Sequence, residues 1–573
     1  MLLHWPSPGE ILGALLVLFV VGAHVAALGY WMIRALEYRG RTPLVGVVAT
    51  AALGLVMLEV FVLAVGHARI GGLTFLNSTT FTVTGVVAAV SIMPAAMRLR
   101  GIAQEARALV GRLGFEWVLV NSMVILFVFA ALSGMRGSMY EDDYKPGAPL
   151  VWAQAGRFIA TDYRICNGMA ATEAIYAVPQ TYYRLIGVRA ALIALHWTHL
   201  LIWVLTALAA GALAESFGAA AVAVAAAVVA IPGMASTAAT AGTDIPCAAM
   251  LTASLAVLFA ERRGEEDDVP FSRAALLLAG ILLGGAITSK PILIVGSAPI
   301  ALFVFVEYWR SAKKANVIGG LCQVLLVAAP AIVIVLMWIA HTYSMTGKIW
   351  DGSGQLIVSS SHDPLWADGE AAGRWPSFLD LVKLPAVPFY IALLGQHEPY
   401  GGRSGVLTMS LSLVGIYMLW RMPPAQRRLG YWALGSALLY FFLLGPFAIK
   451  TRFHDFVWII FASLAALAYT QARGTENRQR PWWHVVYWLV AAGIVYYIVR
   501  VEYYAVTGSQ RQAWGAIMAI TAAVAVLVAA HVRGRAEGPV RVPWWRLAVC
   551  GAFIFLAVVG ILDSIARKLI LPG

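Results

Sequence analysis

Apolar segments long enough to cross a bilayer recur along nearly the whole 573-residue chain, and this repetition restricts the possible folds more than any other feature. A helix crosses the hydrocarbon core with roughly 20 apolar residues. Only helices and closed barrels satisfy every backbone hydrogen bond inside lipid, and continuous apolar runs of this length are typical of helices. The sequence therefore predicts an all-α, polytopic membrane protein.

The low share of charged residues also indicates a membrane protein. Only 12% of the residues are charged, whereas soluble globular proteins carry about 25%. Most of the net charge of +12 lies in short connections between apolar segments, where Lys and Arg set the orientation of a chain in the membrane. We therefore expect membrane lipids, and no nucleic acid, as partners of these basic residues.

The basic connections predict the sidedness of each span. Arg34, Arg39 and Arg41 follow the first span, 11–32, so this end is expected on the cytoplasmic side. Continued alternation predicts about sixteen spans and places two long loops, 136–186 and 342–403, at the outer face. Segments 172–185 and 378–394 in these loops are predicted to be amphipathic helices lying on the outer surface.

The chain divides into three parts in this prediction. Residues 1–114 form accessory N-terminal transmembrane helices, residues 115–470 form a catalytic transmembrane module with both outer loops, and residues 471–573 form C-terminal transmembrane helices. No soluble domain is expected.

The first outer loop opens with an unusual run of acids. Glu141, Asp142 and Asp143 follow a predicted span directly, and Tyr144 comes next. Charged groups at a bilayer boundary must be solvated, paired or bound to something. We predict that this run supplies a catalytic carboxylate.

Further polar residues lie in other outer turns, which hold them near the membrane plane, where a lipid head group sits. Asp244 and Lys290 occupy two short turns, and the remaining residues are His397, Glu398, Arg403, Lys450, Arg452, His454 and Asp455. A carboxylate can take the proton from an attacking hydroxyl as general base. Cations can neutralise the charge that builds on a departing phosphate. The mixture suits sugar transfer from a polyprenyl-phosphate donor.

The order and spacing of these motifs resemble the GT-C superfamily of integral membrane glycosyltransferases, nearest to the bacterial aminoarabinose-transferase and protein O-mannosyltransferase type. The matching motifs, which span about residues 115–470, are Asp142-Asp143-Tyr144, Asp244 in its short turn, Lys290-Pro291 and Arg452-Phe453. The resemblance implies a GT-C-type helical bundle. Three predicted spans precede the module, so the acidic loop is not the first outer loop of this chain.

The resemblance also implies roles. Asp142 or Asp143 is the base, and Asp244 orients the acceptor or a metal ion. The donor phosphate is expected on Lys290 and Arg452, with Lys450 and Arg403. Substrate contacts are expected from Tyr144, His397 and Glu398. A divalent metal is left open as a cofactor. The lack of a soluble outer domain favours a lipid-linked or glycan acceptor over a protein. The expected location is a bacterial inner membrane, with the site facing the periplasm.

Other interpretations stay open. Asp142 and Asp143 could be solvated loop acids, Asp244 could cap a helix that begins before Pro246, and Lys290 could extend to the head groups. His196 and His199 could bind haem or a metal together with His24, or be core histidines. At the level of function, a polymerase or ligase of lipid-linked glycans would rely on Arg403 and His397. A secondary transporter or flippase would place its charges at mid-membrane.

Overall fold

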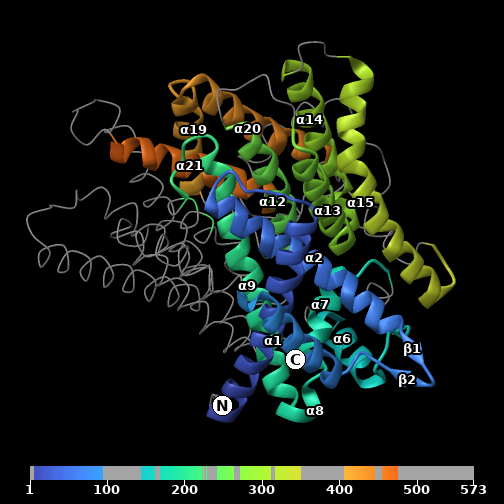
Figure 1. Ribbon diagram of the computed structural model, residues 1–573. Coiled ribbons are helices and arrows are strands. Elements are labelled where there is room, and N and C mark those ends of the chain that lie inside the picture. The colour runs from blue at the N-terminus through green and yellow to red at the C-terminus, as the bar shows by residue number, and fades with distance from the viewer. Residues whose placement is uncertain are drawn as a thin grey trace, which may run out of the picture.

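The computed structural model describes residues 6–94, 144–161, 168–221, 242–263, 271–311, 316–349, 406–444 and 455–474, together with 224 and 228. These residues are almost all helical, apart from one two-stranded hairpin (Figure 1). Six of the described helices are long and apolar enough to cross a membrane. The predicted all-α, multi-pass membrane class is therefore confirmed. The predicted span at 116–135 and the spans after 474 lie outside the described residues.

The first two spans form a helical hairpin. Helix α1 (Pro8–Ala35) begins with a capping box, in which Ser7 and Glu10 bond each other's backbone N–H groups, and α2 (Pro43–His67) begins with Thr42 as its cap. Gly29 of α1 and Gly54 of α2 each lie against a backbone carbonyl of the other helix, where a Cβ would not fit. Small residues of this kind let two membrane helices approach closely.

A short hairpin follows α2 and leads to the third span. Strands β1 (Arg69–Ile70) and β2 (Leu73–Thr74) pair antiparallel. Both turn residues, Gly71 and Gly72, have positive φ, which is the geometry of a type I′ hairpin turn. The chain then runs into the apolar helix Ser78–Pro94.

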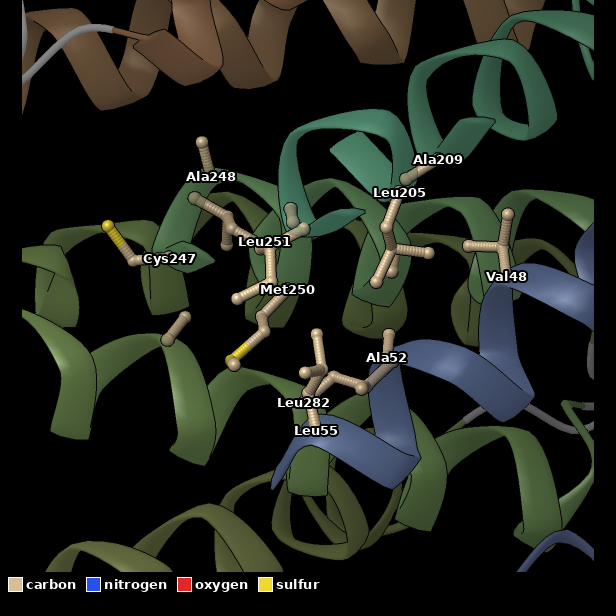
Figure 2. Close-up of a cluster of buried hydrophobic side chains, with 14 of the residues drawn as sticks. Val48, Ala52, Leu55, Leu205, Ala209, Cys247, Ala248, Met250, Leu251 and Leu282 are labelled. Atoms are coloured by element: carbon tan, nitrogen blue, oxygen red, sulfur yellow. The ribbon is translucent and has the colours of Figure 1, made fainter. Parts of the chain in front are cut away.

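Four helices form the centre of the described structure. Helices α2, α9 (Val188–Glu215), α12 (Asp244–Glu261) and α13 (Arg273–Ser289) pack together. Figure 2 shows side chains of all four helices meeting in one apolar cluster, with Ala52, Leu205, Met250 and Leu282 among them. Each of these four except Leu205 is fully buried. The site described below lies at one end of this cluster.

The remaining helices surround this centre. A 3₁₀ segment, η3 (Pro291–Gly296), leads into α14 (Ser297–Ser311), and α15 (Val317–Thr346) packs closely on α13 at Gly280 and Gly284. Helices α19 (Val406–Leu419), α20 (Pro424–Leu444) and α21 (Asp455–Gly474) form a second group, in which α21 also contacts α9 and α12.

Some connections that are predicted to share one side of the membrane lie together in the described residues. Beyond the end of α2, the Phe158 N–H donates to Gly66 O at 3.1 Å, and the Leu76 N–H donates to Gly156 O at 3.0 Å. At the opposite end of α2, the ion pair Arg41–Glu261 joins the connection between α1 and α2 to the last residue of α12. The grouping agrees with the predicted alternation of spans.

The predicted amphipathic helix in the first long loop is present, but it is buried and does not lie on the surface as predicted. It forms α7 (Ala171–Gln180), and all ten residues are buried. Helix α7 lies against α2, α9 and α6 (Tyr144–Ala155), and is followed by the short α8 (Tyr183–Ile186). Helix α6 packs on α7 (Figure 1), and Tyr176 of α7 contacts His199 of α9 and Gly242. The second predicted amphipathic helix, 378–394, lies outside the described residues.

Candidate functional site

Two of the predicted site residues form a direct ion pair. Asp244 is the first residue of α12, and Lys290 follows the last residue of α13; the Lys290 ammonium donates to the Asp244 carboxylate. The pair joins two turns that are 46 residues apart in sequence. Each charge also suits its helix, because an anion is favoured at a helix N-terminus and a cation at a C-terminus.

The local sequence explains why Lys290 lies at this point. Helix α13 ends at Ser289 because Lys290 is extended, with φ −156° and ψ 101°, as expected for a residue before proline. Pro291 then starts η3 as its first residue. The backbone break brings the lysine side chain to the beginning of α12.

The structure does not support two alternative roles for these residues, which are contact of Lys290 with head groups and capping of α12 by Asp244. The side chains of Asp244 and Lys290 are 9% and 15% exposed, so Lys290 does not extend away to head groups. Thr243, not Asp244, occupies the cap position of α12. A buried ion pair forms at a net cost unless its geometry and additional hydrogen bonds compensate for lost hydration. A pair retained under those conditions is a candidate for function.

Two further buried acids lie on α2 and α7, and one of them bonds the residue that precedes Lys290. Ser289 Oγ donates to Glu59 Oε1 at 3.4 Å, and Glu59 is fully buried in the second span. Glu173 of α7 is also buried and lies within electrostatic range of Glu59. The sequence reasoning missed both acids as site residues. Glu59 carried a signal, because an ionisable residue within a span is a functional candidate by default.

A hydroxyl of α7 holds the turn that precedes Asp244. Tyr176 Oη donates to Gly242 O at 2.9 Å and lies 2.6 Å from His199 Nδ1 on α9. Tyr176 and His199 are both fully buried. The haem alternative is not supported for His24, since its ring nitrogens bond Val20 O and Thr84 Oγ1. Among the described residues, no group of three His, Cys, Asp or Glu side chains is placed to hold a metal ion.

A further buried acid lies at the start of α21. Asp455 begins α21, is buried, and lies within electrostatic range of the Cys247 thiol on the first turn of α12. Tyr440 of α20 lies within electrostatic range of both. Residues from α2, α7, α12, α13 and α21 therefore gather around the beginning of α12.

The other predicted site residues are placed as follows. Tyr144 is the first residue of α6, which packs on α7, the helix that carries Glu173 and Tyr176. Asp142, Asp143, His397, Glu398, Arg403, Lys450 and Arg452 lie outside the described residues. In the described part of the site, the carboxyl groups of Glu59, Glu173, Asp244 and Asp455 outnumber the single ammonium of Lys290.

The chain was compared with protein families, curated proteins and solved structures. No protein-family model matches the sequence, and no curated protein matches it. Solved structures of ArnT from Cupriavidus metallidurans are similar to it. The structure bound to undecaprenyl phosphate shares 14% identity at a TM-score of 0.49, covering 78% of this chain and 76% of that chain. The apo structure shares 15% identity at a TM-score of 0.48, covering 80% and 77%.

Proposed function

We propose that this protein is a membrane glycosyltransferase that moves a sugar from a polyprenyl-phosphate-linked donor to an acceptor hydroxyl at the outer face of the membrane. The observation that carries the proposal is the buried pair of Asp244 and Lys290, which joins two of the predicted motifs at one point. The proposed location is a bacterial inner membrane with the site facing the periplasm.

In this proposal Lys290 holds the donor phosphate. An ammonium has three N–H donors, so one lysine can hold a carboxylate and a phosphate oxygen together. Asp244 fixes the direction of the ammonium and stands at the N-terminus of α12. A cation positioned in advance stabilises the charge that builds on the leaving phosphate without reorganising at the moment of reaction.

One lysine is not enough for this task, because the charge of Lys290 is already paired with Asp244. A phosphate at this point needs further cations to balance its charge. We assign that part to Arg452, with Lys450 and Arg403. Asp455, three residues after Arg452 in sequence, begins α21, which contacts α12, and this contact supports the choice.

The general base in this proposal is Asp142 or Asp143, which takes the proton from the acceptor hydroxyl. Tyr144, His397 and Glu398 contact the substrates. The acceptor is lipid-linked or glycan in preference to protein, because no soluble outer domain is expected to hold a protein chain. Asp244 orients the acceptor or a divalent metal in addition to its pairing with Lys290.

The first test is mass spectrometry of the lipids that co-purify with the protein in mild detergent. Wild type is compared with Asp142→Asn/Asp143→Asn, with Lys290→Met, and with Lys348→Met. Lys348 is an exposed lysine just beyond the end of α15 and serves as the matched control. We expect a polyprenyl-phosphate sugar that is enriched in the Asp double variant, reduced in Lys290→Met, and unchanged in Lys348→Met.

Three outcomes contradict the proposal. Ordinary phospholipids alone in every sample remove the support for a polyprenyl donor. Sugar transfer that persists in Asp142→Asn/Asp143→Asn but stops in Arg403→Ala/His397→Ala indicates a polymerase or ligase. Solute uptake by proteoliposomes with no covalent product indicates a transporter.

A further inference from the structure

The turn before Asp244 is bonded by a side chain from another helix. The carbonyl of Gly242, two residues before Asp244, accepts a hydrogen bond from the Tyr176 hydroxyl at 2.9 Å. The cap position, Thr243, makes no side-chain hydrogen bond to α12. The bond from Tyr176 is therefore a direct link between this turn and another helix.

The direction of the hydrogen bonds can be assigned. A tyrosine hydroxyl has one proton, and here it is donated to the Gly242 carbonyl, which can only accept. The contact of 2.6 Å with His199 then requires that the histidine donates from Nδ1 to the tyrosine oxygen. The imidazole thus fixes the orientation of the hydroxyl, and the hydroxyl fixes the turn.

The packing around these groups restricts them to this arrangement. Tyr176 and His199 are fully buried, and their rings meet edge to face with centroids 6.0 Å apart. Inside the protein a hydrogen bond has no water to replace it, so losing the hydroxyl leaves a buried carbonyl and a buried N–H without this partner.

We infer that Tyr176 and His199 are positioning residues: the chain His199–Tyr176–Gly242 holds the first turn of α12 so that Asp244 meets Lys290. The inference rests on the proposed function for its catalytic consequence, but the positioning itself is measurable without it. Neither residue is assigned contact with the substrate.

Cys247 reports the state of this turn. Its Sγ lies 2.9 Å from Thr243 O and 3.1 Å from Asp244 O, and the residue is buried. A thiol in this position reacts with a maleimide only when the first turn opens. In a background of Cys166→Ser, Cys322→Ser and Cys550→Ser, the rate of N-ethylmaleimide labelling in detergent measures that opening.

Tyr176→Phe removes the hydroxyl and keeps the ring. Loss of one buried hydrogen bond shifts a local equilibrium by about 5- to 30-fold, and we expect the labelling rate of Cys247 to rise by that factor. The matched control is Tyr182→Phe. Tyr182 is also buried, but its hydroxyl bonds Thr82 at 2.9 Å and not the turn before α12. We expect no change in labelling there.

His199 provides a second and independent pair of variants. Asn places an N–H donor near the position of histidine Nδ1, so His199→Asn should keep the slow labelling. Gln places its donor farther out, so His199→Gln should label faster. These two variants decide the question if Tyr176→Phe does not accumulate as folded protein.

The inference is overturned if Tyr176→Phe labels at the wild-type rate, if Tyr182→Phe rises equally, or if His199→Asn and His199→Gln behave alike. In the transfer assay, a displaced Asp244 turn should lower kcat/KM by about 10- to 100-fold. If wild-type protein transfers no sugar at all, the proposed function fails, while the labelling result still decides whether this chain of residues positions the turn.

Discussion

Substitutions in the Asp244–Lys290 pair can separate its contribution to stability from its contribution to catalysis. Removing one partner of a buried ion pair costs about 3–5 kcal/mol, because the remaining charge stays desolvated. The Lys290 side chain is 15% exposed, so water reaches it in part and we expect about 2–3 kcal/mol for Asp244→Asn or Lys290→Met. Asp244→Asn/Lys290→Met leaves no charge behind and should recover most of this loss.

The exchanged variant, Asp244→Lys/Lys290→Asp, keeps an ion pair but reverses both charges relative to the helix ends. Each reversed charge opposes its helix dipole at a cost of about 0.3–1 kcal/mol. We therefore expect its stability to lie between the single variants and the wild type. Its transfer activity should be absent, because the cation no longer starts from the break between α13 and η3.

These free energies correspond to measurable changes in the melting temperature. Unfolding entropy is about 2.1 cal/mol/K per residue, or roughly 1.2 kcal/mol/K for 573 residues. A loss of about 2–3 kcal/mol then lowers Tm by roughly 2 °C. Tryptophan fluorescence during heating in one detergent resolves a shift of this size. Strictly additive effects of the two single substitutions would refute the coupling. Normal sugar transfer by the neutral double variant would refute the role of Lys290 at the phosphate.

Two further predictions concern packing away from the site. Gly54→Ala forces a Cβ against the Val25 carbonyl of α1, so Tm should fall by a few degrees, whereas Gly22→Ala, which has open space, should leave it unchanged. Equal Tm values for the two variants would contradict the close helix contact. At the inner end, buried Glu307 lies 3.6 Å from Arg428 Nε, and Glu307→Leu should lower Tm by about 2–4 °C. Glu307→Leu/Arg428→Met should regain most of it, and a further fall would show that the pair is not coupled.

The helices could be predicted from the sequence because the signals for them are local. The first span, predicted at 11–32, extends over Pro8–Ala35 in the structure. The additional turn at its start follows from the capping box of Ser7 and Glu10, which hydropathy does not detect. Proline after Lys290 likewise marks the end of α13 in the sequence.

The site could be predicted only in part because depth in the membrane does not say which helices are neighbours. Alternation placed Asp244 and Lys290 at the same face, but their direct pairing depends on the packing of α12 against α13. Tyr176 could not be predicted as a site residue for a related reason. The apolar spacing of its segment indicates a helix with one apolar face, and only tertiary packing reveals that all ten residues of this helix are buried.

The division of the chain into accessory helices at 1–114 and a catalytic module at 115–470 stays a prediction. The structure describes close packing between these parts: α1 lies against α9, and α2 lies against α7, α9, α12 and α13. A fully buried acid of α2, Glu59, also accepts a hydrogen bond from the residue that precedes Lys290.

That hydrogen bond has a consequence for the order in which the protein is made. Glu59 and Ser289 are 230 residues apart, so at about 5–20 residues per second Glu59 enters the membrane roughly 10–50 s before its partner is synthesised. During this time the acid must be sheltered, because a carboxyl group at the centre of a span costs about 2.5–3.5 kcal/mol in lipid. Helices α9, α12 and α13 follow the α1–α2 hairpin in the chain, and α13 ends at Ser289, so the hydrogen bond to Glu59 can form only after α13 has been inserted.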